Sequence, residues 1–310
     1  MNSVTLRQLR YFEALLRHRH FGRAAEAAAV SQPALSVQIR ALEEALGGPL
    51  FERGPREVRP TPFGTRVAAE VRGVLRGVEA LGALAQAEAG GLTGLRIGVI
   101  PTVAPYLLPA LVRGLERARP GLDLEIRETV TPRLLEALAD GALDTALVAL
   151  PVSEPALVEL PLFREPFVLV RPESEATKPV PDARALARMR LLLLEEGHCF
   201  RDQALEFCGQ GARMRHGLDG SSLATLVQMV GAGLGVTLIP EMAVAVETRS
   251  APVAVARFAD PAPDRTLGLV WRRSSPLGAE LRALAPVLRA AAGASAPAGG
   301  DALRRSGPVG

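Results

Sequence analysis

The stretch FGRAAEAAAVSQPALSVQIRALEEALG, residues 21–47, predicts two helices joined by a tight turn. The first is short and alanine-rich, so it can pack closely on its neighbours. Ser31 can cap the second helix, and Pro33 is tolerated in its first turn. Four apolar residues recur along the second helix at the spacing of one buried stripe: Leu35, Ile39, Leu42 and Leu46. Together with a capping-box pattern, TLRQ at residues 5–8, this arrangement is typical of a helix-turn-helix.

The polar residues of the second helix lie on a different face from its apolar stripe. Gln32, Ser36 and Arg40 share that face, and Gln38 flanks it. Such side chains can reach base edges in the major groove, while arginines bind phosphates. The alternative is an ordinary three-helix bundle with a solvated polar face. The residues that we expect to contact double-stranded DNA are Ser31, Gln32, Pro33, Ser36, Gln38, Arg40, Arg53, Arg56 and Arg59.

A basic hairpin is predicted at LFERGPREVRPT, residues 50–61, where arginines recur at intervals of three. This segment suits a wing that follows the DNA backbone or enters the minor groove. The first 72 residues hold eleven arginines and seven glutamates, with no lysine or aspartate. That positive balance is mild, but it favours a polyanionic partner if the charges share one face.

A long helix is predicted after the hairpin, with Thr61 as its cap and Pro62 in its first turn. Apolar residues alternate along it by four and three, which is the a/d seam of a coiled coil: Val67, Val71, Val74, Val78, Leu81 and Ala85. A seam of this length on a thin rod needs a partner, so we expect a dimer. Two-fold symmetry then predicts a dyad-related DNA site. Gly90 and Gly91 end the rod and act as a hinge.

From Leu95 onward, strand and helix patterns alternate, which favours βαβ units and a parallel sheet. The segment LPLFREPFVLVRP, residues 160–172, carries the chain to a second lobe, and residues 265–292 return it to the first. Two α/β lobes joined by two crossings enclose a cleft. Small ligands bind such sheets at the carboxyl ends of strands. Thr102 and Thr131 lie near such ends and can donate to a small polar ligand; alternatively, they cap helices or turns.

Both cysteines of the chain lie in GHCFRDQALEFC, residues 197–208. Cys199 stands beside His198 and Arg201, ahead of a short predicted helix with Asp202 as a possible cap. Cations and the helix dipole would then favour the thiolate. If the whole segment were helical, the Cα atoms of the two cysteines would be about 13 Å apart, whereas a disulfide needs less than about 7 Å. A bond between these thiols would therefore require the segment to refold.

Three interpretations of this segment remain open from the residues alone. The thiols can be passive groups in a reduced protein, or they can be a redox pair. They can also join His198 and His216 in a metal site, although the spacing fits no standard zinc pattern. The spacing is also wrong for a CxxC oxidoreductase. We therefore expect no metal and no cofactor.

The composition is that of a soluble globular protein, with 48% hydrophobic and 22% charged residues. No run of eighteen residues is free of charges and helix breakers, and the first residues lack the apolar core of a signal peptide. We therefore expect a cytoplasmic protein without a membrane segment, in which thiols are normally reduced.

The series RHFGRAAEAAAVSQPALSVQIRALEEALGGPLFER followed by TPFG resembles the LysR-type transcriptional regulators, and the resemblance covers nearly the whole chain. It implies an α+β multidomain protein, usually tetrameric. An N-terminal winged helix-turn-helix and a dimerising linker helix precede a two-lobed α/β sensor domain like a periplasmic binding protein. We place these three parts, and a disordered tail after them, at residues 1–61, 62–91, 92–293 and 294–310. Within the sensor domain, lobe I takes about residues 92–164 and 267–293, and lobe II about residues 165–266.

The cysteine segment and several others, among them SSLATLVQMVGAGLGVTLIP, are similar to the hydrogen-peroxide-sensing members of that family. The resemblance implies that Cys199 is the peroxidatic thiolate and Cys208 the resolving thiol, so that oxidation forms a disulfide between them. It also implies roles for further polar residues: His198 and Arg201 around the thiolate, and Thr102, Thr131, His216 and Arg265 around the peroxide.

The same resemblance implies the partners of the protein. These are promoter DNA of antioxidant genes, hydrogen peroxide, further copies of the chain as a homodimer or homotetramer, RNA polymerase, and glutaredoxin or thioredoxin as reductant. Two alternatives remain. One is a LysR-type regulator of a small metabolite with passive cysteines, and the other is a thiol peroxidase. The DNA-reading helix and the apolar seam argue against an enzyme, because catalysis needs neither.

Overall fold

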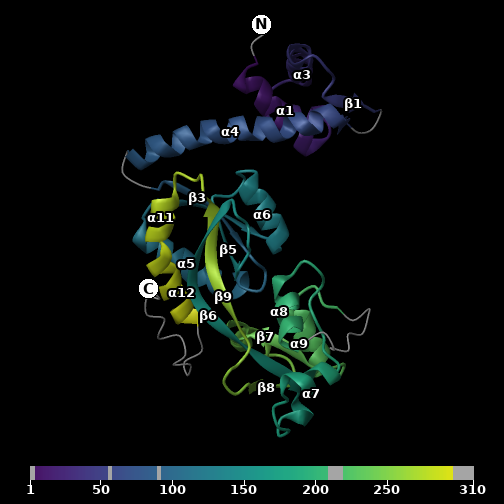
Figure 1. Ribbon diagram of the computed structural model, residues 1–310, viewed down its shortest axis with the longest axis vertical. Coiled ribbons are helices and arrows are strands. Elements are labelled where there is room, and N and C mark those ends of the chain that lie inside the picture. The colour runs from purple at the N-terminus through teal and green to yellow at the C-terminus, as the bar shows by residue number, and fades with distance from the viewer. Residues whose placement is uncertain (1–3, 55–57, 89–91, 209–218, 296–310) are drawn as a thin grey trace. The chain divides into compact units, whose positions relative to one another are not determined.

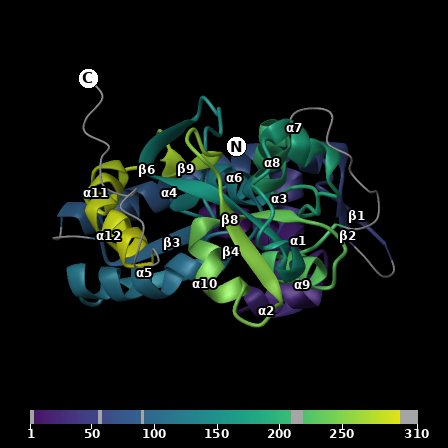
Figure 2. The same ribbon diagram turned by 90° about the horizontal axis from the view of Figure 1, so that it is seen from below.

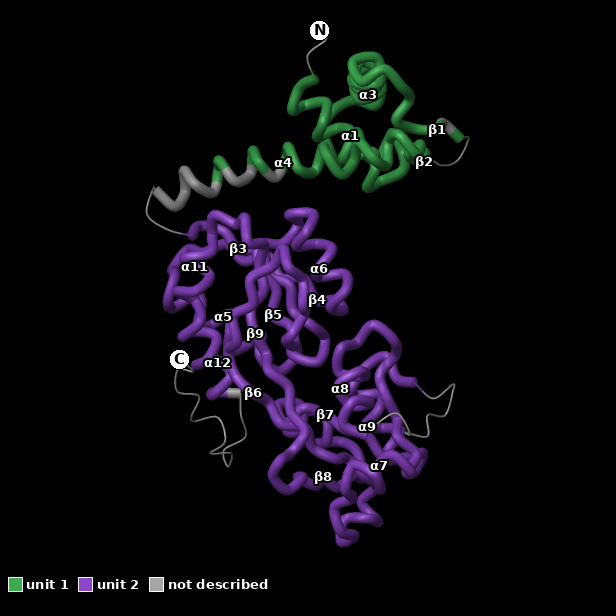
Figure 3. Tube along the Cα trace, viewed as in Figure 1, with its two compact units in different colours: residues 1–88 green, residues 89–310 purple. Residues whose placement is uncertain are grey.

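The computed structural model describes residues 4–54, 58–88, 92–208 and 219–295. The chain divides into two compact units, residues 1–88 and 89–310, which Figure 3 colours separately. The first unit has one hydrophobic core cluster, and the second unit has two. The predicted hinge at Gly90 and Gly91 and most of the predicted tail lie outside the described residues.

Three helices form the core of the first unit: α1 (Leu6–His18), α2 (Phe21–Ala27) and α3 (Gln32–Leu46). The predicted capping box opens α1, because the Thr5 N–H donates to Gln8 Oε1 at 2.9 Å and the Gln8 N–H donates to Thr5 Oγ1 at 3.3 Å. Ser31 caps α3 as predicted, and Gly47 ends it at a φ of 76°, which favours glycine. The predicted stripe of α3 is confirmed: Leu35, Ile39 and Leu42 are fully buried, and Leu46 is partly buried against them.

The predicted hairpin is present as two short antiparallel strands, β1 (Phe51–Arg53) and β2 (Val58–Pro60). Glu43 ties this hairpin to α3, since its carboxylate accepts the backbone N–H of Leu50 at 2.8 Å and that of Phe51 at 3.3 Å. The three helices and the hairpin together make a winged helix-turn-helix, as the sequence predicts.

The long helix α4 (Pro62–Glu88) follows the wing directly. Thr61 begins it as predicted, because its hydroxyl accepts the Gly64 N–H at 2.9 Å. Gly64 passes very close to the preceding loop: a Cβ there would lie 2.1 Å from the carbonyl oxygen of Leu50. Only glycine therefore allows the wing and α4 to pack in this way.

Some residues of the predicted apolar seam of α4 are buried, and others are exposed. Val71 is buried in the core of its own unit together with Ala68 and Leu75, so the prediction that it faces a partner is wrong. Val74 and Leu81 are 49% and 66% exposed. The apolar pattern therefore serves the unit's own core near the start of α4 and leaves apolar side chains exposed further along.

The first lobe of the second unit contains the predicted parallel strands. β3 (Gly94–Val99) pairs in parallel with β4 (Asp123–Glu128) and with β5 (Thr145–Leu150). The crossover helices are α5 (Ala104–Ala118) and α6 (Thr131–Ala139). Figures 1 and 2 both place α11 (Gly278–Ala283) and α12 (Ala285–Ser295) beside α5. The helix α12 includes the first two residues of the predicted tail.

Two long antiparallel strands join the lobes, and Figure 1 shows them running through both. They are β6 (Leu157–Pro172), which crosses as predicted, and β9 (Asp264–Arg272), which returns. The strand order is β4-β3-β5-β9-β6-β7, with β8 also paired to β6. The strands of the two lobes therefore follow one another in a single hydrogen-bonded order. The lobes join where β6 pairs with β9.

In the second lobe, the later half of β6 pairs antiparallel with β7 (Thr237–Pro240) and β8 (Val253–Arg257). Its helices cover a separate apolar cluster and comprise α7 (Ala183–Arg188), α8 (Cys199–Cys208), α9 (Leu223–Gly231) and α10 (Val244–Glu247). The short 3₁₀ turns are Glu173–Glu175 and Glu241–Ala243. In the described parts of the chain, no helix combines the length and apolar character that crossing a membrane requires.

Candidate functional site

Helix α8 carries the two cysteines at its opposite ends, since it begins at Cys199 and ends at Cys208. Its inner face repeats every four residues, and Phe200, Ala204 and Cys208 are buried in the second lobe. Nine residues at about 1.5 Å per residue separate the two Cα atoms by about 13 Å, and both thiols are free. The two sulfur atoms therefore cannot bond while α8 remains helical.

The start of α8 differs from the prediction in one respect. Asp202 was expected to cap the helix, but the helix begins three residues earlier, at Cys199. Asp202 instead lies exposed in the first turn. The expectation is therefore wrong, and the thiol of Cys199 itself belongs to the first helical residue.

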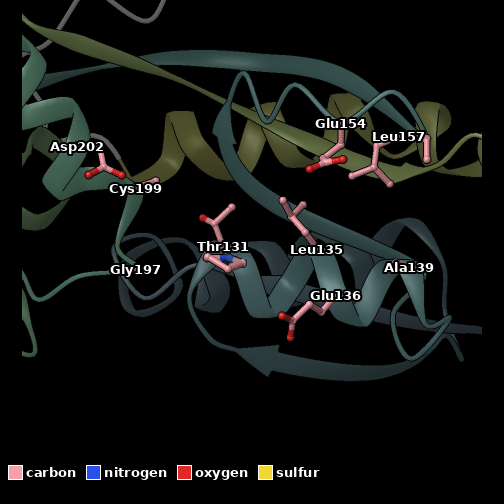
Figure 4. A pocket seen from close by; sticks show the side chains of 11 residues that line it. Thr131, Leu135, Glu136, Ala139, Glu154, Leu157, Gly197, Cys199 and Asp202 are labelled. Atoms are coloured by element: carbon pink, nitrogen blue, oxygen red, sulfur yellow. The ribbon is translucent and has the colours of Figure 1, made fainter. Parts of the chain in front are cut away.

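Cys199 is partly exposed and lies at one end of a cavity of about 560 Å³. The cavity lies between the lobes of the second unit, because α6 and the start of β6 form one side and the beginning of α8 forms the other (Figure 4). It is lined by Thr131, Pro132, Leu135, Glu136, Ala139, Glu154, Ala156, Leu157, Gly197, Cys199 and Asp202. A small solute in this cavity therefore lies against Cys199.

Thr131 supplies a polar group to the same cavity. It is the first residue of α6, and its hydroxyl is buried without a hydrogen-bond partner in the described structure. Figure 4 shows the Thr131 side chain on the side of α6 that faces Cys199. A buried hydroxyl without a partner costs about 1–3 kcal/mol, so this position favours a ligand or water oxygen beside the thiol. The cavity thus brings together Thr131 and Cys199, two of the residues that the sequence predicts for the site.

Thr102 and Arg265 form a second, fully buried cluster. Arg265 Nη1 donates to Thr102 Oγ1 at 2.8 Å, and its Nη2 donates to the Thr102 carbonyl oxygen at 3.1 Å. Arg265 also forms an ion pair with Glu165 across the β6–β9 junction, with an N–O distance of 2.7 Å. Burial raises the pKa of Glu165, and the charge of Arg265 opposes that rise. Neither Thr102 nor Arg265 lines the cavity at Cys199, so the structure separates these two predicted peroxide ligands from Thr131.

Phe200, the residue that follows Cys199, connects the start of α8 to the cluster of Thr102 and Arg265. The guanidinium carbon of Arg265 lies 5.5 Å from the centre of the Phe200 ring, a cation–π contact. Phe200 also packs edge-on against Phe167 with ring centres 4.8 Å apart. The start of α8 is thereby linked to the junction between the lobes. Glu165 is a member of this group that the sequence did not reveal.

The two predicted neighbours of the thiolate have different surroundings. Burial lowers the pKa of His198, and the nearby charge of Glu195 only partly opposes this, so the imidazole is neutral at neutral pH. Arg201 is buried, donates to the Leu194 carbonyl oxygen at 2.6 Å and pairs with Asp219 at 3.2 Å. Arg201 therefore fastens α8 to its own lobe. The remaining predicted ligand, His216, lies outside the described residues.

The surroundings of Cys208 are the opposite of those of Cys199, because Cys208 is buried. Its side chain is 5% exposed, and burial raises the pKa of its thiol to about 11. The group is therefore protonated at neutral pH, and a protonated thiol is a poor nucleophile. Among the described residues, no cluster of three or more histidine, cysteine or acidic side chains is placed to hold a metal ion.

The predicted DNA-reading face lies on α3 in the first unit. Gln32, Pro33 and Arg40 are exposed, whereas Ser36 and Gln38 are partly exposed. The hydroxyl of Ser31 accepts the Ala34 N–H at 3.4 Å, so this side chain acts as a helix cap. Arg59 is exposed on β2, while Arg56 and the side chain of Arg53 lie outside the described residues. The same face contains the apolar side chain of Val37, which is 59% exposed and which its spacing in the sequence did not single out.

Two family models match the chain. Residues 6–65 match the helix-turn-helix of bacterial regulatory proteins of the lysR family, and residues 89–293 match the LysR substrate binding domain. Among curated proteins, a probable hydrogen peroxide-inducible genes activator from Streptomyces viridosporus is 48% identical over 294 residues, covering 93% of this chain and 94% of that protein.

Solved structures give the same relationship. A full-length OxyR from Pseudomonas aeruginosa with a cysteine-to-aspartate substitution has a TM-score of 0.76 and 39% identity, covering 93% of this chain and 95% of that chain. An OxyR from Corynebacterium glutamicum with a cysteine-to-serine substitution, described as bound to H2O2, has a TM-score of 0.66 and 37% identity. That match covers 94% of this chain and 93% of the other.

Proposed function

This chain belongs to the LysR family of bacterial regulators, and from that membership we propose that it is a hydrogen-peroxide-sensing transcription regulator of the OxyR type. One observation carries the proposal: a partly exposed cysteine shares a cavity with a buried hydroxyl that has no partner in the described structure, and a second cysteine ends the same helix. Relatives that match nearly the whole chain bear the names OxyR and peroxide-inducible activator.

The chemistry assigns different tasks to the two thiols. The Cys199 thiolate attacks one oxygen of hydrogen peroxide, an S–O bond forms, the O–O bond breaks and water leaves after protonation. Cys208 then attacks the sulfur of the resulting sulfenic acid, a disulfide forms and a second water leaves. Two thiols are thus oxidised and one peroxide is reduced. The second step requires α8 to unwind, because its helical length keeps the sulfur atoms apart.

Several polar groups support the first step. The Thr131 hydroxyl holds the peroxide beside Cys199, and neutral His198 offers a hydrogen bond to the reacting groups. Thr102 and Arg265 act from the neighbouring cluster, where Phe200 contacts Arg265. His216 completes the site in this proposal. Unwinding α8 disturbs the Phe200 contact and so transmits oxidation to the junction of the lobes.

The assembly and partners follow from the same proposal. The exposed Val74 and Leu81 of α4 belong to a surface that joins two copies of the chain. A homodimer or homotetramer then binds a dyad-symmetric promoter through α3 and the basic wing, and acts on RNA polymerase. The protein works in the cytoplasm, near the nucleoid when bound to DNA, where glutaredoxin or thioredoxin reduces the disulfide.

The test compares reduced and peroxide-treated full-length protein on a duplex that the reduced protein selects from a random pool. We expect stoichiometric peroxide to form a Cys199–Cys208 disulfide, seen by mass spectrometry, and to change the DNase footprint. The Cys199→Ser variant should give one footprint under both conditions. No disulfide in the wild-type chain, or an unchanged footprint despite the disulfide, would contradict the proposal.

The same samples distinguish two alternative functions, because each predicts a different result. A metabolite-responsive regulator with passive cysteines is the second candidate, because the cavity of about 560 Å³ is far larger than hydrogen peroxide requires. This function predicts a footprint that is the same with and without peroxide. A thiol peroxidase predicts sustained peroxide turnover with thioredoxin as reductant and no dependence on DNA.

A further inference from the structure

Val37 stands out on the face of α3 that is proposed to read DNA. It is the sixth residue of the helix, and its side chain is 59% exposed. The apolar stripe of the same helix, which includes Leu35 and Ile39, is fully buried on the other side. Val37 is therefore not part of the core, and its apolar side chain faces solvent among polar neighbours.

This exposure has no structural benefit within the unit. Valine is a weaker helix former than alanine, glutamine or arginine, so an exposed position in the middle of α3 gains nothing from it. Isolated exposed valines are common in proteins. Val37, however, adjoins other apolar surface, because it lines a hollow of about 440 Å³ together with Val30, Pro33 and Ala34.

The remaining lining of the hollow is polar or cationic. Arg7 and Tyr11 of α1 form one side, Gln38 of α3 completes it, and no carboxylate is among the described residues that line it. Arg40 is exposed three residues further along α3. An apolar floor beside a cation and a hydroxyl suits a ligand that carries both an apolar group and a negative charge.

A thymidine nucleotide in the major groove has this chemistry. Its C5 methyl group is the apolar feature among the base edges of the groove, and its phosphate is an anion within reach of a neighbouring helix. Side chains of a recognition helix meet base edges in the major groove. Val37 lies on that helix, and Arg7 lies on the neighbouring helix α1 and lines the same hollow.

We propose that Val37 recognises the C5 methyl group of one thymine in each half-site and thereby sets the base preference at that position. The proposal rests on the DNA-binding function proposed above and adds a specificity-determining contact to it. Arg7 and Tyr11 hold the adjacent phosphate, which fixes the register of the methyl group against Val37. The polar residues Gln32, Gln38 and Arg40 address the hydrogen-bonding base edges around it.

The test uses the full-length protein and a duplex that it selects from a random pool. Each thymine is replaced in turn by uracil, which lacks only the C5 methyl group. At one position in each half-site, we expect uracil to weaken wild-type binding about fourfold, the effect of removing one buried methyl group. The Val37→Ala variant should bind the thymine duplex about fourfold more weakly per half-site and should not distinguish uracil from thymine there.

The Val37→Thr variant is the matched control, because it keeps the shape and one methyl group of valine. It should retain most of the uracil effect, and circular dichroism should show an unchanged helix content for both variants. If uracil weakens the binding of wild type and of Val37→Ala equally at every thymine, the inference about Val37 is wrong. The proposed DNA-binding function still holds in that case, provided that the protein prefers certain sequences. If the protein selects no duplex at all, the inference and the proposed function are both wrong. If Val37→Ala binds every duplex normally but loses activation of RNA polymerase, Val37 faces a protein and the inference is overturned.

Discussion

The two ends of helix α8 give its two cysteines opposite properties. At the first end, Cys199 lines a cavity of about 560 Å³ together with Thr131, whose hydroxyl has no hydrogen-bond partner among the described residues. At the other end, Cys208 is 5% exposed, and burial raises the pKa of its thiol to about 11. One helix can therefore present one thiol to an oxidant while it keeps the other protonated and out of reach. Oxidation and disulfide formation are thereby separated into two steps.

Removing either sulfur atom should change the reaction with peroxide more than any other substitution in α8. Cys199→Ser should abolish both the sulfenic acid and the disulfide, because the exposed thiol is lost. Cys208→Ser should abolish only the disulfide and leave a sulfenic acid that dimedone traps, as mass spectrometry would show. The wild-type chain with dimedone is the control. Dimedone labelling of Cys208 in the Cys199→Ser variant would reverse the assignment of the two ends.

The burial of Cys208 also predicts a dependence of stability on pH. A thiol in the unfolded chain loses its proton near pH 8.5, whereas Cys208 in the folded chain retains it to about pH 11. Between these values only the unfolded state releases this proton, so the contribution is intact below about pH 8.5 and is lost as the pH rises. We expect the free energy of unfolding to fall by about 2–3 kcal/mol more in wild type than in Cys208→Ala over this window.

Urea unfolding with a reductant present, followed by circular dichroism, measures this difference. Comparing the two chains at each pH cancels the titration of their shared arginines and tyrosines. Parallel curves for wild type and Cys208→Ala up to pH 11 would mean that Cys208 is accessible to water in the reduced protein, and the contrast between the two ends would disappear.

The sequence was sufficient where local patterns determine the structure. The caps at Thr5 and Ser31, the stripe of α3 and the crossing strand β6 could all be predicted from spacing. It was insufficient for contacts between distant residues. The ion pair of Glu165 with Arg265 joins positions 100 residues apart, and only the register of β6 with β9 brings them together.

Val71 and Arg201 show where patterns in the sequence were not enough. Periodicity showed that α4 has an apolar seam, but it could not show that the core of the same unit would cover Val71. The sequence placed the charge of Arg201 close to Cys199, but it could not show that Arg201 pairs with Asp219 and donates to the Leu194 carbonyl oxygen. At Val37 the sequence held no signal, because only the structure reveals that this apolar side chain is exposed.

A smaller effect tests whether α8 unwinds before the disulfide forms. Glu206 is exposed in α8, and glycine there weakens a helix by about 1 kcal/mol relative to alanine. We therefore expect Glu206→Gly to form the disulfide about fivefold faster than Glu206→Ala after peroxide is added. Both variants should form the Cys199 sulfenic acid at the same rate. Quenched-flow mass spectrometry separates the two steps, and equal disulfide rates would show that the helix need not open first.

A weak effect is expected at His198, beside the partly exposed Cys199. Because burial lowers its pKa, the imidazole is already neutral at pH 7 and supplies a hydrogen bond but no positive charge. His198→Gln, which keeps hydrogen-bonding capacity, should therefore slow sulfenic acid formation by less than about fivefold. Between pH 7 and pH 8, the ratio of the wild-type rate to the variant rate should stay constant. Glu195 opposes the effect of burial, so Glu195→Gln should lower the pKa of His198 further and leave this ratio unchanged. A ratio that grows as the pH falls toward 6.5 would instead show that a protonated imidazole assists Cys199, and the first end of α8 would then owe its reactivity to charge as well as to exposure.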